Sequence, residues 1–114
     1  MDVFEALAAP TRREIIEMLS SKGRLSASDI YGRFDASAPA ISQHLKILRE
    51  AKLVRVERRG QLRIYQIDPK GMAEIDEWSQ RMTRLWNKRF DALDKVLQVE
   101  KAKLKANAKK ERKQ

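Results

Sequence analysis

The amino-acid sequence predicts a mainly α-helical domain with a small β-hairpin and a long C-terminal helix. Three observations support this prediction. Apolar residues recur at helical spacing in four segments before residue 51. Two short β-branched runs, 53–57 and 62–67, flank the turn sequence at 58–61. A stripe of apolar residues then runs from Ile75 to Leu97 at close to 3.6 residues per step, which predicts one amphipathic helix over residues 72–97.

Two helices are expected at the start of the chain. The first spans residues 2–9 and ends at Pro10. Its expected inward residues are Val3, Phe4 and Leu7. The second spans residues 11–21, with Ile15, Ile16 and Leu19 inward. Because glutamates lie close to Arg12 and Arg13 in sequence, we expect these arginines to form a solvated helix surface rather than a phosphate contact.

Two further helices with a tight turn at residues 35–36 follow. Residues 26–34 begin with a Ser-x-x-Asp start signal, and Ser37 is a good N-cap for a helix over residues 37–50. That helix has an apolar stripe for the core, formed by Ile41, Leu45 and Leu48. Its opposite stripe carries Pro39, Ser42, Gln43 and Lys46. Short hydrogen-bonding side chains on one helix face favour close approach to base edges in a major groove.

The predicted hairpin is basic at its tip. One register pairs Val56 with Leu62 and puts Gly60 at the left-handed position of a three-residue loop. Tyr65 and Ile67 would lie on the other face of the strand from Leu62 and Ile64, so the sequence leaves the register open. Either register places three cations at or near the tip, Arg58, Arg59 and Arg63. Clustered like charges have no folding benefit, so this tip favours phosphate or minor-groove contact. Two short helices followed by a basic hairpin predict a winged helix-turn-helix.

Two stretches of the sequence resemble a known family. They are Leu-Ala-Ala-Pro-Thr-Arg-Arg-Glu-Ile-Ile-Glu-Met-Leu at 7–19 and Ser-Ala-Pro-Ala-Ile-Ser-Gln-His-Leu-Lys-Ile-Leu-Arg-Glu-Ala-Lys-Leu-Val at 37–54. With them, residues 7–67 resemble the ArsR-type family of bacterial winged-helix repressors. The resemblance implies a homodimeric repressor of a short palindromic operator in double-stranded DNA, often released by an effector. Residues 70–97 are similar to a metal-independent branch of that family with a long C-terminal helix.

The candidate site residues follow from these patterns and from the resemblance. The expected DNA-binding residues are Ser37, Pro39, Ala40, Ser42, Gln43, His44, Lys46, Arg58, Arg59 and Arg63. For His44, the only histidine, the resemblance suggests a DNA contact, and a structural role beside the core stays equally open. Helical spacing explains the aromatic stripe as core and dimer interface without a ligand pocket. The expected dimer interface comprises Val3, Phe4, Leu7, Trp78, Met82, Leu85, Trp86 and Phe90.

Neither a metal site nor catalysis is expected. Metal-responsive members of the resembled family carry a Cys-x-Cys pair where this chain has Ser26 and Ser28, and the predicted final helix contains no histidine. Thiolate and imidazole ligands select soft and borderline metals, so no metal or cofactor is predicted. The chain has no cysteine and no Gly-rich phosphate loop, and no nucleophile and base can be paired. We therefore expect a protein that is not an enzyme.

Charge and composition agree with a nucleic-acid partner. The net charge is +9 and the pI is about 10.1, which favours a polyanion. Residues 101–114 contain seven Lys/Arg and one acid, so we divide the chain into a domain, 1–99, and a basic flexible tail, 100–114. No membrane span or signal peptide is recognised, which predicts a cytoplasmic protein without a membrane partner. Two alternatives stay open: a less specific nucleoid-associated or RNA-binding protein, and a protein-interaction scaffold.

Overall fold

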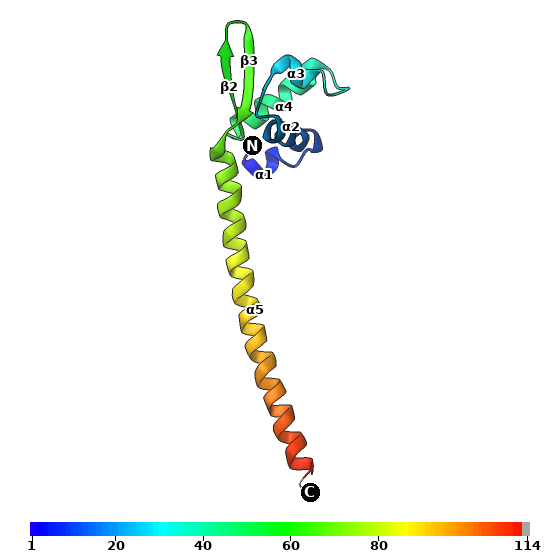
Figure 1. The fold of residues 1–114 in the computed structure, drawn as a ribbon, viewed down its shortest axis with the longest axis vertical. Helices are drawn as coiled ribbons and strands as arrows, with labels where there is room; N and C mark the ends of the chain where they lie inside the picture. Colours follow the sequence, from blue (N-terminus) through cyan, green and yellow to red (C-terminus); the bar gives the residue numbers. More distant parts are fainter. Residues whose placement is uncertain (113–114) are drawn as a thin grey trace. The chain divides into compact units, whose positions relative to one another are not determined.

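The computed structural model describes residues 1–112, which form a mainly helical fold with a small antiparallel sheet (Figure 1). The chain divides into two compact units, Met1–Glu77 and the residues from Trp78 onward. The first unit contains four short helices, the sheet and the beginning of α5, and the second contains the remainder of α5. The predicted fold class is confirmed.

The first two helices are α1 (Val3–Ala6) and α2 (Pro10–Lys22). α1 is shorter than the expected 2–9 span. Of the residues expected inside it, Val3 is buried, whereas Phe4 is 41% exposed and Leu7 is only partly buried. Pro10 lies in the first turn of α2, where its missing N–H removes no helical hydrogen bond.

The helix-turn-helix comprises α3 (Ala27–Tyr31) and α4 (Ala38–Glu50). The Ser26 hydroxyl accepts from the Asp29 N–H at 3.1 Å, and the Asp29 carboxylate accepts from the Ser26 N–H at 3.3 Å. This reciprocal cap is the one that the Ser-x-x-Asp signal predicts. The Ser37 hydroxyl accepts from the Ala40 N–H at 3.3 Å and caps α4. All three residues of the predicted core stripe are buried: Ile41, Leu45 and Leu48.

The sheet has the strand order β1-β3-β2, with β1 (Arg24–Ser26), β2 (Val54–Arg59) and β3 (Leu62–Ile67). β1 was not predicted, because three residues are too few to show an alternating pattern. It pairs antiparallel with β3, so that Leu25 lies opposite Tyr65. This pairing connects the start of the helix-turn-helix to the hairpin.

The hairpin register differs from the one that would give a three-residue loop. Val56 lies opposite Tyr65 and Arg59 opposite Leu62, which leaves a two-residue turn at residues 60–61. Gly60 has φ +61°, so the expected left-handed conformation is confirmed. The observed register places Ile67 opposite Val54, and it leaves Ile64 and Leu62 opposite Glu57 and Arg59.

The turn between α4 and β2 packs against the beginning of α5 (Pro69–Arg112). Lys52 in this turn has φ +60°, and its carbonyl accepts from the Gly71 N–H at 2.8 Å. A Cβ on Gly71 would lie 2.5 Å from the Lys52 carbonyl oxygen and 2.8 Å from the Leu53 side chain. Because real Cβ atoms do not approach so closely, this contact requires glycine.

α5 is longer than the sequence predicts. The expected end near Leu97 is wrong, because the helix continues to Arg112. Residues 101–112 are therefore helical, and the proposed division into a domain and a flexible tail stays a prediction. The predictions for residues 113 and 114 concern positions outside the described residues. None of the described helices is long and apolar enough to cross a membrane.

Candidate nucleic-acid interface

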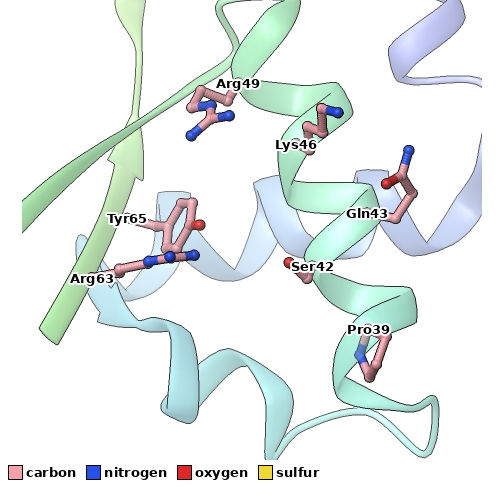
Figure 2. A pocket seen from close by; sticks show the side chains of 7 residues that line it. All are labelled: Pro39, Ser42, Gln43, Lys46, Arg49, Arg63 and Tyr65. Atoms are coloured by element: carbon pink, nitrogen blue, oxygen red, sulfur yellow. The ribbon is translucent and has the colours of Figure 1, made fainter. Parts of the chain in front are cut away.

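A polar groove lies between α4 and β3 in the first unit (Figure 2). Its lining is formed by Pro39, Ser42, Gln43, Lys46, Arg49, Arg63 and Tyr65. The first four residues are the stripe that the sequence predicted to face DNA. The structure therefore brings that stripe together with one of the three predicted wing arginines.

Core packing determines which face of α4 lines the groove. Successive residues of a helix differ in direction by about 100°. Burial of the apolar stripe turns Gln43 and Lys46 to the opposite side, where both are exposed, and leaves Ser42 partly exposed. The amide of Gln43 has donors and an acceptor, and a hydroxyl has both, so these side chains can hydrogen-bond to base edges.

Three cations line the same groove, Lys46 and Arg49 from α4 and Arg63 from β3. Figure 2 shows the Arg49 and Arg63 side chains pointing into the space between α4 and β3. Neither ion pair recorded for the described side chains involves any of these three residues. Guanidinium and ammonium groups without an internal carboxylate partner suit phosphate oxygens.

Two groove residues were missed by sequence reasoning. Arg49 lies three residues after Lys46, so extending the polar stripe by one step would have identified it. Tyr65 is only 6% exposed, and its place in the groove depends on the hairpin register. No local sequence signal determines that register, so Tyr65 was not predictable as a groove residue.

The wing tip forms a second basic surface. Arg58 and Arg59 are both exposed there, and a shallow hollow at the tip is lined by Arg58, Gly60, Gln61, Leu62 and Arg63. Arg59 Nε lies 3.6 Å from Glu57 Oε1, with both side chains at least half exposed. A pair this exposed contributes about 0–1 kcal/mol, so it leaves Arg59 available to phosphate. Arg63 lines both the tip hollow and the α4–β3 groove.

His44 lies outside the residues that line the groove. Its Nδ1 is 3.2 Å from Nη1 of Arg12 in α2. A guanidinium can only donate, so Nδ1 accepts and the neutral ring carries its proton on Nε2. Burial and, second, the charge of Arg12 lower the pKa of His44 below its ordinary value of 6.5. Of the two roles left open by the sequence, this contact supports the structural one.

The expectation of a solvated helix surface is wrong for Arg12, which is buried, whereas Arg13 is exposed as expected. Arg12 is 8% exposed and donates to the carbonyls of Ala6 at 2.5 Å and Glu5 at 3.3 Å. Arg13 is exposed, and it donates to two carbonyls of the α1–α2 turn at 2.6 and 3.2 Å. Both arginines therefore satisfy the carbonyl end of α1. Sequence reasoning considered only charged partners and missed these backbone acceptors.

The other predicted residues divide between core and surface. At the beginning of α4, Ser37, Pro39 and Ala40 are exposed. Val3 belongs to the core, so it cannot contact a second chain without unpacking. The predicted α5 residues are 39–59% exposed: Trp78, Met82, Leu85, Trp86 and Phe90. The last two pack edge to face, with ring centroids 5.0 Å apart and an interplanar angle of 89°.

Two helices joined by a tight turn, a polar face on the second helix and a basic hairpin define a winged helix-turn-helix DNA-binding protein. A helix-turn-helix domain family matches residues 7–57. The chain is similar to the transcriptional repressor SdpR of Bacillus subtilis, with 36% identity over 77 residues, covering 68% of this chain and 84% of the relative. It is also 43% identical over 72 residues to the HTH-type transcriptional regulator Rv2034 of Mycobacterium tuberculosis, covering 63% of this chain and 66% of the relative.

Solved structures agree with these relatives. An ArsR-like transcriptional regulator from Rhodococcus sp. RHA1 matches with a TM-score of 0.70 and 29% identity, covering 82% of this chain and 88% of that one. The chain belongs to the ArsR-type family of winged helix-turn-helix transcriptional regulators, which confirms the family that the sequence resembles. Members of this family are DNA-binding transcriptional regulators and not enzymes, so the expectation that the protein is not an enzyme is confirmed as well.

Proposed function

We propose that the protein is a homodimeric repressor that binds a palindromic operator of its own or a neighbouring operon and does not respond to metal ions. The observation that carries the proposal is the α4–β3 groove, where side chains suited to base reading lie together with three cations that have no acidic partner among the described residues. Contacts to base edges select a sequence, and contacts to phosphates supply affinity and orientation. The groove offers both kinds of contact on one surface.

Six of the seven groove residues receive a role from their chemistry. Gln43 and Ser42 hydrogen-bond to base edges, and the exposed Pro39 and Ala40 permit close approach at the beginning of the helix. Phosphates are bound by Lys46, Arg49 and Arg63 in the groove and by Arg58 and Arg59 at the wing tip. Ser37 contributes to DNA binding through its cap, which fixes the first turn of α4.

Dimerisation is supported by the apolar residues that stay exposed. Phe4 and Leu7 near the first helix and the α5 stripe from Trp78 to Phe90 are candidates for the interface. Monomeric proteins rarely expose apolar residues in so long a series. Two copies related by a two-fold axis would read half-sites about 34–36 Å apart, which one recognition helix cannot do. Val3 is left out of this interface because it is buried.

Metal independence is supported by the donor atoms of the chain. Ser26 and Ser28 stand where the metal-responsive pattern has two thiolates, and the chain contains no cysteine. The single histidine has Nδ1 engaged with Arg12. No group of three or more His, Cys, Asp or Glu side chains among the described residues is arranged to hold a metal. Hydroxyls are poor ligands for the soft and borderline metals that thiolates select.

Binding to genomic fragments tests the proposal. Fragments retained by the purified protein identify a candidate operator, and fluorescence anisotropy then compares it with a shuffled duplex of equal length. Gln43→Ala should weaken operator binding by about 5- to 150-fold, since a bidentate base contact is worth about 1–3 kcal/mol, and it should change shuffled-duplex binding much less. The matched comparison is Lys46→Ala, which should weaken both duplexes by similar factors.

Other outcomes point to other functions. Equal losses on both duplexes for Gln43→Ala would show that this face of α4 does not read bases. A wild-type protein that binds all duplexes alike, or prefers RNA, would indicate the less specific nucleoid-associated or RNA-binding alternative. Absence of any nucleic-acid binding would leave the protein-interaction scaffold. Operator affinity that falls on addition of zinc, cadmium or arsenite would contradict metal independence.

A further inference from the structure

One buried cation connects three helices of the first unit. Arg12 in α2 donates from Nε to the Ala6 carbonyl at 2.5 Å and from Nη2 to the Glu5 carbonyl at 3.3 Å, both in α1. Its third nitrogen, Nη1, lies 3.2 Å from Nδ1 of His44 in α4. Arg12 is 8% exposed, and it is the one charged residue among the described residues that is buried. We call this set of contacts the Arg12 bridge.

The acceptors of the Arg12 bridge are neutral groups. Two are backbone carbonyls and the third is an imidazole nitrogen, and neither of the recorded ion pairs includes Arg12. A buried guanidinium is costly unless its donors are satisfied, so each of the three contacts stabilises the others. Protonation of His44 would remove its Nδ1 lone pair and place a second cation beside the first. The bridge therefore requires neutral His44.

We propose that Arg12 is a positioning residue for DNA reading, because the Arg12 bridge fixes the rotation of α4 through His44. This inference rests on the proposed function. His44 is adjacent to Gln43 in α4. Gln43 lines the groove, whereas His44 lies outside it. A rotation of α4 that breaks the 3.2 Å contact also moves Gln43 relative to base edges. Phosphate contacts from flexible Lys and Arg side chains tolerate such a rotation better than a bidentate base contact does.

The bridge also connects α4 to α1. α1 has four residues, too few to be stable as an isolated helix, so its position depends on its contacts. Two of its carbonyls are bound by Arg12, and its residue Phe4 is 41% exposed and part of the proposed dimer interface. The same guanidinium therefore binds α1, which carries part of the proposed dimer interface, and α4, whose rotation it restricts.

The first test measures the bridge itself. His44 is the only histidine, so its ring can be followed by NMR in the full chain without assignment of others. The wild-type ring should show a protonated Nε2 and a bare Nδ1 at neutral pH. Arg12→Gln should raise the pKa of His44, because a nearby positive charge lowers it in the wild type. Arg13→Gln is the matched control, since Arg13 donates to the carbonyls of Leu7 and Ala8 just after α1 and has no recorded hydrogen bond to His44, and it should leave that pKa unchanged.

The second test measures DNA reading. Arg12→Gln should weaken operator binding by about tenfold or more, as expected for loss of a charge-assisted hydrogen bond, and should weaken shuffled-duplex binding by less than about threefold. Arg12→Lys keeps the charge but not the planar guanidinium, so it should restore only part of the preference for the operator over the shuffled duplex. Arg13→Gln should keep the wild-type ratio of the two affinities. If circular dichroism shows that Arg12→Gln is unfolded, His44→Leu takes its place and should lower the same ratio.

The outcomes separate this inference from the proposed function. An unchanged His44 pKa in folded Arg12→Gln would overturn the bridge. A raised pKa with an unchanged affinity ratio, or a His44→Leu variant with the wild-type ratio, would overturn the positioning role. A wild-type protein without operator preference would overturn the proposed function, and the NMR comparison of Arg12→Gln with Arg13→Gln would still decide whether the bridge exists.

Discussion

Replacement of Gly71 by alanine should destabilise the first unit, although alanine is the better helix former. The added Cβ would lie 2.5 Å from the Lys52 carbonyl oxygen, 2.8 Å from Leu53 Cδ2 and 2.9 Å from the Lys52 carbonyl carbon. Two of these atoms belong to the backbone of a turn whose residue 52 already has φ +60°, so they cannot move freely. Overpacking of this kind costs about 1–3 kcal/mol.

Two smaller effects act in opposite directions. Displacement of the turn weakens the 2.8 Å hydrogen bond from the Gly71 N–H to the Lys52 carbonyl, which is worth about 1 kcal/mol. Alanine stabilises the helix by up to about 1 kcal/mol relative to glycine, because its helix propensity is higher. These two effects nearly cancel, so the net loss should be roughly 1–3 kcal/mol. With a urea m-value of about 1–2 kcal/mol/M, the unfolding midpoint should fall by roughly 1 M.

Urea unfolding followed by far-UV circular dichroism measures this shift. Amide hydrogen exchange at Leu45 and Leu48 gives a readout limited to the first unit, which matters because both tryptophans lie in the second. Gly32→Ala is the matched control: a Cβ there would meet only carbonyl oxygens at 3.6 and 3.8 Å, and its φ is −67°. That variant should be neutral or more stable by up to about 1 kcal/mol. A Gly71→Ala protein as stable as wild type would refute the steric argument.

Three other predictions test the remaining parts of the chain. Lys52→Gly should raise the free energy of unfolding by about 0.5–1 kcal/mol, because glycine relieves the left-handed backbone; an unchanged urea midpoint would show that no strain exists there. Trp86, 59% exposed, should contribute to the dimer, so Trp86→Ala should lower both the dimer fraction in light scattering and operator affinity. A wild-type monomer at micromolar concentration would contradict this. Deletion of residues 101–114 removes seven cations and should flatten the salt dependence by about 0.9 in log K per log salt for each phosphate lost. An unaltered slope would show that this segment does not touch DNA.

Features determined by neighbouring residues were predictable from the sequence. The caps at Ser26 and Ser37 involve partners three residues away, and both formed as expected. The burial of the α4 stripe follows from helical periodicity, and the same periodicity identified four of the seven groove residues. These signals depend on residues that are close in sequence, so they do not depend on which distant segments pack together.

Features that depend on distant partners were not predictable in the same way. β1 exists because Arg24–Ser26 pairs with β3, about 40 residues later in the chain. The hairpin register depends on how β3 packs as well as on its own pattern, and it decides the place of Tyr65 in the groove. Arg12 lies two residues before Glu14 in sequence, yet its observed partners are carbonyls of α1 and the ring of His44. Sequence spacing cannot reveal acceptors of this kind.

Two kinds of contact hold the rotation of α4, and they differ in how strongly they depend on geometry. Apolar packing of Ile41, Leu45 and Leu48 selects the buried face, but the hydrophobic effect is non-directional and tolerates small rotations. A hydrogen bond weakens steeply when its angle departs from linearity, so the contact between Arg12 and His44 restricts the rotation that packing leaves free. In the proposed function Gln43 needs this second restriction, because a bidentate contact to a base would be lost when its amide turns. A helix that only bound phosphates would not need it, which is why the loss of Arg12 should lower operator preference more than affinity for random DNA.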